Sequence, residues 1–439
     1  MKNISKLSTE SYKGVRDFYP EDLFVQNYIF NTWRRVTERF GYTEYNASVL
    51  EPAELYKAKT GEEIVNEQTY AFKDRGDRSV VIRPEMTPTV SRMVAAKRQE
   101  LAYPLRWYST PNVWRYERPQ RGRLREHWQL NIDLFGIEGL EAEQEVISMA
   151  HDLMVAFGAK PDMYNIRINS RQLVNAVMQD YLGLDQVQSA TLSRLIDRMH
   201  KMEHATFVAE VDALFTPSQR EAGKSDHLLD LLKIKSINGL PAQLKDHESV
   251  KELSQLFDSL KNLGIANATF DISLMRGFDY YTDIVFEVFD TDPENNRSLF
   301  GGGRYDGLVE LFGAEKVASV GFGMGDVTLA GFLESHSLVP NLQTETDIYA
   351  VSLGEDTQRA QKVISELREM GLNVATAPNG RKLEKEIKTA LKKGIPYMLF
   401  IGEKELADEQ YTLRDLKAEK EERHSLQRIV SIVKDYRKQ

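Results

Sequence analysis

Apolar positions in the first three quarters of the chain predict a sheet with helices, interrupted by a helical segment. Helical spacing is clear over residues 21–40, where Gly41 ends the helix, and over residues 141–157. Residues from about 170 to 264 are almost wholly helical, and we interpret them as an inserted subdomain. The runs with strand character cover residues 79–82, 107–117, 127–135, 164–168, 269–274, 284–289 and 318–324.

A second pattern begins after a polar, aperiodic stretch. Residues 347–439 alternate strand and helix, which predicts an α/β domain of about a hundred residues with a mainly parallel sheet. We therefore expect a first domain over residues 1–335, a linker over residues 336–346 and a C-terminal domain over residues 347–439. Three lysines of this domain, Lys385, Lys388 and Lys392, recur at helical spacing and fit either RNA phosphates or a solvated helix face.

Composition describes an ordinary soluble protein. The 439 residues are 41% hydrophobic and 28% charged, and no run of eighteen apolar residues predicts a membrane span. The chain has no cysteine, which excludes disulfides, iron–sulfur clusters and thiolate zinc sites and indicates a cytoplasmic protein. The net charge of −9 argues against a protein that coats nucleic acid, but a local basic surface remains compatible with RNA binding.

The most informative stretch is an arginine-rich segment over residues 106–136. If its strands are regular, Arg115 and Glu117 share one face of the first strand, and polar residues share one face of the second. Charged groups on one side of a sheet indicate a polar floor for a charged ligand, and arginine suits a phosphate because its planar fork donates two parallel hydrogen bonds. The alternative is an exposed hairpin with a solvated tip. The arginines are Arg106, Arg115, Arg118, Arg121, Arg123 and Arg125, and the polar residues of the second strand are Gln129, Asn131 and Asp133.

Other motifs refine this picture. Prolines on both sides of Glu85 predict a fixed turn after strand 79–82, and the glycines of residues 301–307 allow a flat ligand to lie against bare backbone. Neither a P-loop nor a Rossmann fingerprint occurs. The spacing H-x-x-E-H over residues 200–204 matches one class of zinc site, but no partner ligand stands nearby, so we expect a charged helix face and no metal held by the protein alone.

Two sequences carry a family resemblance. RYERPQRGR, residues 115–123, with Gln129 and the Phe-Gly pair at 135–136, resembles motif 2 of class II aminoacyl-tRNA synthetases. LMRGFDYYTDIVFE, residues 274–287, resembles the histidine-binding signature of histidyl-tRNA synthetases, and helix 21–40 with the strand that follows resembles motif 1. The resemblance implies an α+β fold: an antiparallel-sheet catalytic domain with a helical insertion, plus a C-terminal α/β anticodon-binding domain.

The resemblance also implies an activity. The family joins histidine to tRNA(His) with ATP and Mg²⁺, as a cytoplasmic homodimer, and we expect the apolar side of helix 21–40 to form the subunit interface. Carried over residue by residue, the catalytic arginines are Arg276 and Arg115. The histidine-binding residues are Glu85, Thr87, Gln129, Asp133, Tyr280 and Tyr281. The ATP-binding residues are Arg115, Glu117, Arg123 and Arg276, and those near the tRNA acceptor end are Gln120 and Arg121.

One motif departs from the family. Motif 3 usually ends in G-x-E-R, with an arginine against ATP, whereas this chain has Thr328 where that arginine would stand. The departure leaves an alternative of another class, a synthetase-like subunit that senses histidine and regulates an ATP phosphoribosyltransferase. Such regulators resemble the catalytic domain alone, so the C-terminal domain favours the ligase. A plain RNA-binding module would explain the arginines but not the acidic signature.

Overall fold

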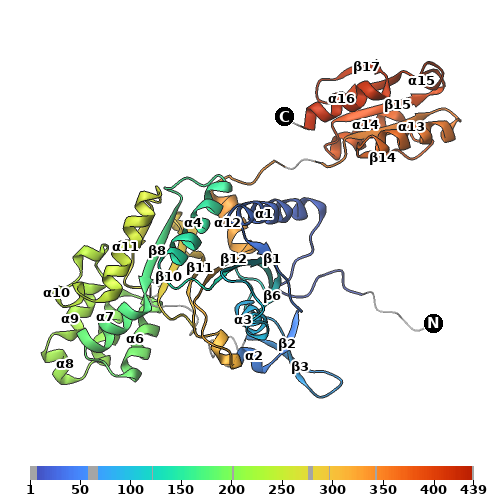
Figure 1. Ribbon diagram of the computed structural model, residues 1–439. Helices are drawn as coiled ribbons and strands as arrows, with labels where there is room; N and C mark the ends of the chain where they lie inside the picture. The colour runs from blue at the N-terminus through green and yellow to red at the C-terminus, as the bar shows by residue number, and fades with distance from the viewer. Residues whose placement is uncertain are drawn as a thin grey trace. The chain divides into compact units, whose positions relative to one another are not determined.

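The chain divides into two compact units, residues 1–340 and residues 341–439, which are described separately. The computed structural model describes residues 7–57, 68–120, 122–199, 202–274, 280–295, 297–341 and 344–437 (Figure 1). Among these residues no helix combines the length and the apolar character needed to cross a bilayer.

A large, mainly antiparallel sheet organises the first unit. Its strands follow the order β1-β5-β7-β12-β11-β10-β8-β9, β6 pairs with β7, and the outer pairs β1–β5 and β8–β9 are parallel. A small sheet, β2-β4-β3, completes the unit. The large-sheet strands are β1 (Thr43–Glu44), β5 (Leu105–Ser109), β6 (Asn112–Trp114), β7 (Glu126–Phe135), β8 (Tyr164–Ser170), β9 (Ala268–Phe270), β10 (Ile284–Asp290), β11 (Ser298–Arg304) and β12 (Ser319–Gly325), and those of the small sheet are β2 (Leu50–Pro52), β3 (Tyr70–Lys73) and β4 (Ser79–Ile82).

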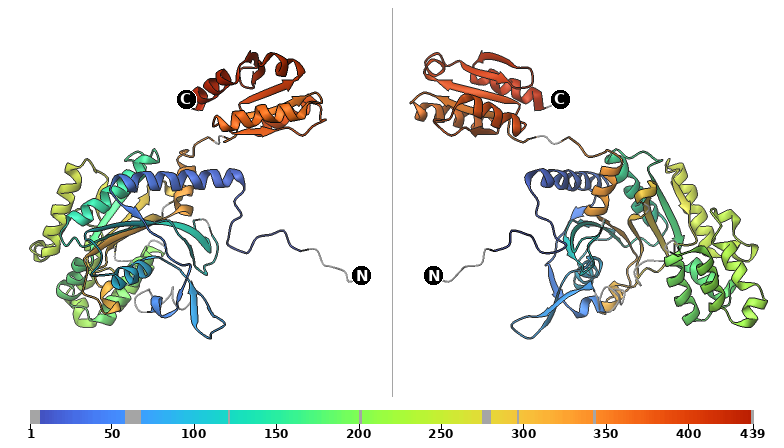
Figure 2. Two further views of the ribbon diagram at one scale, coloured as in Figure 1. Left: turned by 45° about the vertical axis from the view of Figure 1, so that its right-hand side comes forward. Right: turned by 180° about the vertical axis from the view of Figure 1, so that it is seen from behind.

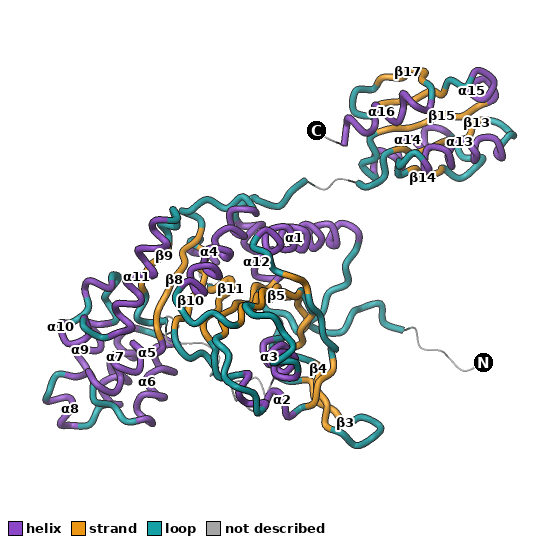
Figure 3. The backbone as a smooth tube through the Cα atoms, in the orientation of Figure 1, coloured by secondary structure: helices purple, strands orange, loops and turns teal. Residues whose placement is uncertain are grey.

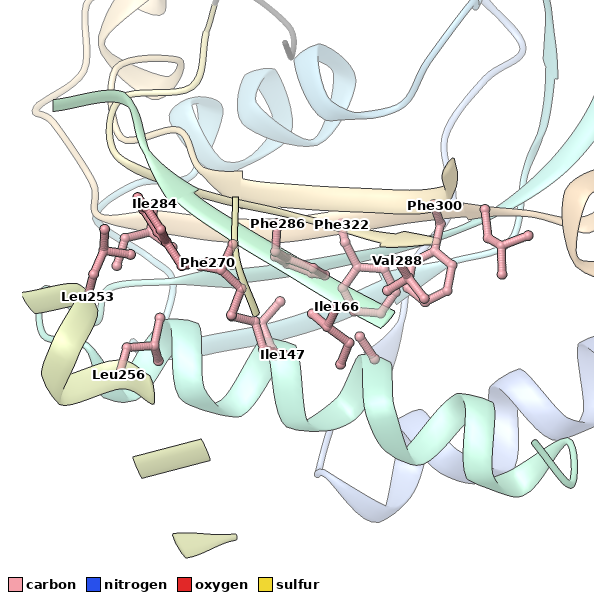
Figure 4. Packing of buried hydrophobic residues seen from close by; sticks show 14 of the residues in the cluster. Ile147, Ile166, Leu253, Leu256, Phe270, Ile284, Phe286, Val288, Phe300 and Phe322 are labelled. Atoms are coloured by element: carbon pink, nitrogen blue, oxygen red, sulfur yellow. The ribbon is translucent and has the colours of Figure 1, made fainter. Parts of the chain in front are cut away.

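Alternation of side chains gives the large sheet two different faces. The even-numbered positions of β7, β10 and β12 are apolar and pack under helices α4 and α11, as Figure 4 shows for Phe286, Phe322 and Ile147. The opposite face carries polar residues of β7 and glycines of β11 and β12. The helices outside the insertion are α1 (Pro20–Arg39), α2 (Glu54–Lys57), α3 (Thr87–Ala96), α4 (Glu141–Ala156), α12 (Asp326–Ser335) and the 3-10 turns η5 (Pro293–Asn295) and η6 (Val309–Phe312).

Helix α1 uses its apolar side within its own unit. Ile29, Trp33 and Val36 are buried in the core, and α1 packs against α4 and α12 (Figure 2). The Trp33 indole N–H points to the Met324 sulfur, 3.0 Å away on β12. The same chain therefore covers Ile29, Trp33 and Val36, and these three side chains do not take part in a subunit interface; the interface itself stays a prediction.

The arginine-rich hairpin is less regular than the sequence suggests. The predicted strand 107–117 is two strands, β5 and β6, separated at Pro111, which has no N–H for the ladder. After Trp114 the chain leaves the strand, and the Tyr116 N–H donates to the carbonyl of Gln68 at 2.6 Å. Alternation predicted that Arg115 and Glu117 share one face of a regular strand. They do not, because the strand ends at Trp114.

The segment between β8 and β9 is helical, as the sequence predicts, and its helices gather beside that edge of the sheet (Figure 3). Residues Ala176–Tyr181 form a π-helix that continues from α5. The elements are α5 (Arg171–Asn175), η2 (Ala176–Tyr181), α6 (Gln186–Arg198), α7 (His204–Leu214), α8 (Pro217–Glu221), α9 (Lys224–Leu231), η4 (Ile237–Gly239), α10 (Ala242–Lys245) and α11 (Glu248–Asn262).

The second unit is an α/β sheet of order β14-β13-β15-β16-β17 with its own core. The first three strands are parallel, as predicted, but β16 and β17 add an antiparallel hairpin that the charged sequence KEERH did not suggest. The elements are β13 (Ile348–Leu353), α13 (Thr357–Glu369), β14 (Val374–Thr376), α14 (Leu383–Lys392), β15 (Tyr397–Gly402), α15 (Glu403–Asp408), β16 (Tyr411–Asp415), β17 (Lys420–His424) and α16 (Leu426–Arg437).

Candidate active site

A cavity of about 480 Å³ lies over the polar face of the large sheet. Its walls come from β7, β10, β11 and β12, from the turn before α3 and from the segment between β6 and β7. A cavity of this size that combines polar and apolar walls suits a small organic ligand.

Glycines keep the floor of the cavity flat. A Cβ on Gly302 would stand 2.0 Å from the Gly321 carbonyl oxygen, and one on Gly321 would stand 2.1 Å from the Ile132 carbonyl oxygen. On Gly323 a Cβ would fall 1.6 Å from Nε2 of Gln129, so this glycine makes room for that side chain. The strands therefore tolerate no side chain at positions 302 and 321, and a ligand can lie directly on the backbone there.

One end of the cavity holds a buried carboxylate. Asp133 is 2% exposed, and its two oxygens accept hydrogen bonds from Tyr305 (2.6 Å) and Tyr45 (3.0 Å). Burial raises the pKa of Asp133 to about 6, and the two tyrosine hydroxyls oppose that rise. Each oxygen keeps a second lone pair, so the carboxylate can still accept an N–H from a ligand.

A second acid, Glu85, lies on the turn before α3. Its carboxylate accepts a hydrogen bond from Tyr280 (3.1 Å), and its carbonyl oxygen accepts one from Tyr56 (3.1 Å). The turn is anchored by Arg83, whose buried guanidinium donates to the carbonyl oxygens of Ala47 (2.8 Å) and Asn112 (2.9 Å). These bonds hold Glu85 in place at the cavity wall.

The other end of the cavity carries arginine. Arg115 donates through Nε to the Pro84 carbonyl (2.9 Å), which ties the segment after β6 to the turn of Glu85. Arg123 pairs with Glu117 at 3.3 Å while half of its side chain stays exposed to solvent. An exposed pair of this kind is weak, so Arg123 can exchange its partner for an anionic ligand at little cost.

A neutral histidine, His127, also lines the cavity, near Arg115. Burial, reinforced by the charges of Arg115 and Arg16, lowers the pKa of His127 to about 3, so its ring is uncharged at physiological pH. Arg16 itself is bound to Asp326 at 2.7 Å, and the other oxygen of Asp326 accepts the Trp128 N–H at 2.9 Å. This part of the wall therefore presents an uncharged aromatic ring.

Comparisons with known proteins agree with this geometry. A family model described as histidyl-tRNA synthetase matches residues 14–326, and one described as anticodon binding domain matches residues 347–436. A histidine–tRNA ligase of Leptospira biflexa is 43% identical over 414 residues, 94% of this chain and 94% of the relative. The chain belongs to the histidyl-tRNA synthetase family.

Solved structures support the same fold. The histidyl-tRNA synthetase from Nostoc sp. PCC 7120 superposes with a TM-score of 0.82 at 24% identity, covering 98% of this chain and 100% of that one. A protein from Bacillus halodurans C, titled an ATP phosphoribosyltransferase regulatory subunit/histidyl-tRNA synthetase, gives a TM-score of 0.73 at 22% identity over 91% of this chain and 99% of that one. At such identities both likenesses concern the fold alone, which is the predicted class II synthetase fold.

Most of the residues that the histidyl-tRNA synthetase resemblance singles out line this cavity, although they come from distant parts of the chain. Gln120 is exposed and pairs with Arg123 through two backbone hydrogen bonds, but it does not line the cavity. Arg121 and Arg276 lie outside the described residues, and so does His200 of the H-x-x-E-H spacing. Among the described residues no three acidic, histidine or cysteine side chains form a metal cluster. The predicted residues in the cavity wall are Glu85, Thr87, Arg115, Glu117, Arg123, Gln129, Asp133, Tyr280 and Tyr281.

Sequence reasoning missed four residues of the candidate site. Tyr45 and Tyr305 hold Asp133 but stand 88 and 172 positions away from it, and no local pattern marks either. His127 shares the polar face of β7 with Gln129, so alternation alone would have indicated it. Glu287, the last residue of the signature, lies on β10 and also lines the cavity, although the sequence reasoning assigned it no role.

Proposed function

We propose that this protein activates histidine with ATP to histidyl-adenylate and transfers the histidyl group to the 3′ end of tRNA(His). The supporting observation is one continuous cavity whose wall holds the carboxylates of Asp133 and Glu85 as well as the arginines Arg115 and Arg123. Histidine brings two cationic or N–H groups and ATP brings a polyanion, so each substrate faces groups of the opposite character.

Histidine occupies the acidic end in this proposal. Its α-ammonium group is held by Glu85, Thr87 and Gln129, and its imidazole lies between Asp133 and the tyrosines Tyr280 and Tyr281. At neutral pH the Asp133 carboxyl is mainly ionised, since its pKa is about 6. It then accepts a ring N–H, and an analogue without that N–H leaves a buried acid unpaired, which gives strong discrimination.

ATP occupies the arginine end. Arg115, Glu117 and Arg123 bind it in this proposal, together with Arg276, which we assign to the α-phosphate by resemblance. A carboxylate oxygen of histidine forms a bond to the α-phosphorus while the bond to pyrophosphate breaks, and cations stabilise the charge on the phosphoryl oxygens. The terminal ribose hydroxyl of the tRNA, positioned near Gln120 and Arg121, then attacks the acyl carbon, and AMP leaves.

Mg²⁺ fits this site as a partner of ATP. Magnesium is usually held by one or two carboxylates and substrate phosphates, and the cavity offers the carboxylates of Glu117 and Glu287 for this purpose. When bound, the ion neutralises phosphate charge. We also assign the protein to the cytoplasm, where its tRNA substrate is used.

Pyrophosphate exchange tests the proposal. Purified protein should incorporate labelled pyrophosphate into ATP only when histidine is added, and should then charge tRNA(His). Arg276→Ala should abolish exchange while histidine still binds, since losing a transition-state cation costs about 3–4 kcal/mol. Histidine binding without exchange by the unaltered protein would instead identify the regulatory subunit.

We further propose a homodimer, formed through a surface other than the apolar side of α1. Leu311 and Phe312 are 45% and 39% exposed, and they line a hollow together with Pro52 and Leu55. An exposed apolar patch of this kind indicates an interface. Sedimentation of the unaltered protein should give the mass of a dimer, and a monomeric mass would refute the assembly. Leu311→Asp should dissociate the dimer, whereas the control Val187→Asp, at an exposed apolar residue of the insertion, should not.

A further inference from the structure

The wall of the cavity beside the first turn of α12 brings together residues from three distant segments. A Cβ built on Gly122, which lines the cavity, would stand 3.9 Å from Cγ2 of Thr328 and 4.0 Å from Nη1 of Arg297. The Arg297 guanidinium and the Thr328 side chain therefore flank the same glycine. Gly122 has φ +75°, a backbone conformation that favours glycine. Because glycine has no side chain, nothing from this residue separates Arg297 from Thr328.

Hydrogen bonds to backbone oxygens fix the Thr328 side chain in this arrangement. The Thr328 hydroxyl donates to the carbonyl oxygens of Leu299 (2.8 Å) and Gly325 (3.2 Å), which ties the beginning of β11 to the beginning of α12. Ser298 and Leu299 line the cavity, so Arg297, one residue earlier, stands at its rim. The single hydroxyl hydrogen of Thr328 is committed to backbone oxygens, and this position contributes no positive charge.

We propose that Arg297 supplies the missing cation and contacts the phosphate groups of ATP. This inference rests on the proposed function, because it assumes that ATP occupies the arginine end of the cavity. The Arg297 side chain is exposed, long and always charged, which suits a group that closes over a polyanion after it has entered. A planar guanidinium also offers a phosphate two parallel hydrogen bonds.

Direct binding measurements test the proposal without requiring catalysis. Isothermal titration with ATP should show about a tenfold weaker affinity for Arg297→Ala, the loss expected for one hydrogen-bonded charge pair, and an intermediate affinity for Arg297→Lys. Histidine affinity should stay within twofold. Arg75→Ala is the matched control, since Arg75 is an exposed arginine at the tip of the β3–β4 hairpin.

Two results would overturn the assignment. Unchanged ATP affinity in Arg297→Ala would show that the guanidinium does not contact the nucleotide. An equal loss of affinity for adenosine and ATP would show that it contacts the nucleoside and not the phosphates. If the unaltered protein binds ATP but catalyses no histidine-dependent exchange, the proposed function fails, while the affinity comparison still decides the role of Arg297.

Discussion

Replacing Asp133 with asparagine should stabilise the first unit while removing activity. Burial raises the pKa of this carboxyl from 3.8 to about 6 in the folded protein. Each pKa unit corresponds to about 1.4 kcal/mol, so the folded state disfavours the ionised form by about 3 kcal/mol at pH 8. Asparagine is nearly isosteric and uncharged, and Asp133→Asn should therefore recover up to about 3 kcal/mol of unfolding free energy.

The sign of this effect depends on pH. The folded protein binds the Asp133 proton more tightly than the unfolded chain, so the free energy of unfolding of the unaltered protein falls as pH rises from 3.8 to about 6. Above this range the carboxyl is ionised in both states and the full penalty is present. Below it the carboxyl is protonated in both states, and the advantage of asparagine should vanish.

Urea denaturation followed by tryptophan fluorescence measures this difference. All four tryptophans, residues 33, 107, 114 and 128, belong to the first unit, so the signal does not report on residues 341–439. The asparagine variant should have a higher midpoint than the unaltered protein at pH 8, and a smaller advantage at pH 5. Histidine-dependent exchange should fall at least about a hundredfold, because a buried N–H partner is lost.

A buried carboxylate that faces a cation provides the control. Asp271 is 8% exposed and accepts hydrogen bonds from Arg167 (3.2 Å) and the Ser273 hydroxyl (2.6 Å). Asp271→Asn should lower the midpoint, since it removes a paired charge. If Asp133→Asn is no more stable than the unaltered protein at pH 8, or if the difference does not change with pH, the argument from desolvation is refuted.

Three further outcomes are expected. Gly323→Ala should raise the KM for histidine in exchange assays with little effect on the urea midpoint, because the new Cβ displaces only the Gln129 side chain; a normal KM would contradict the geometry. Arg304→Ala should lower the unfolding free energy by about 3–5 kcal/mol, since Glu143 would lose both of its buried bonds to Arg304 (2.6 and 2.7 Å), and an unchanged urea midpoint would refute this. Deleting residues 341–439 should preserve histidine-dependent exchange but severely depress tRNA charging, and undiminished charging would give those residues another task.

Short-range patterns account for what the sequence predicted well. Alternation along β7 placed Gln129 and Asp133 on one face, and both line the cavity. The spacing of apolar residues also predicted α1 and α4 and the helical character of the insertion. Each of these inferences needs only neighbours in the chain, and for that reason local sequence was sufficient.

What local sequence could not show depends on contacts between distant segments. The apolar side of α1 looked unpartnered because α4 and α12, which cover it, come more than a hundred residues later. Tyr45 and Tyr305 acquire their role only when β5, β7 and β12 bring them beside Asp133. The hairpin of β16 and β17 escaped notice because its outer strand is an exposed edge whose charged residues give no buried face to recognise.

The flat floor of the cavity limits how this enzyme can change during evolution. A Cβ on Gly302 or Gly321 would stand only 2.0 or 2.1 Å from a backbone oxygen of the neighbouring strand, so any larger residue would push the strands apart, whatever its chemistry. New substrate preferences therefore cannot arise at these two positions. They must come from β7 and from the tyrosines supplied by outlying segments, where a side chain can be exchanged while the sheet stays intact. The two glycine positions thus stay constant, and the part of the pocket that can vary is confined to its rim and one wall.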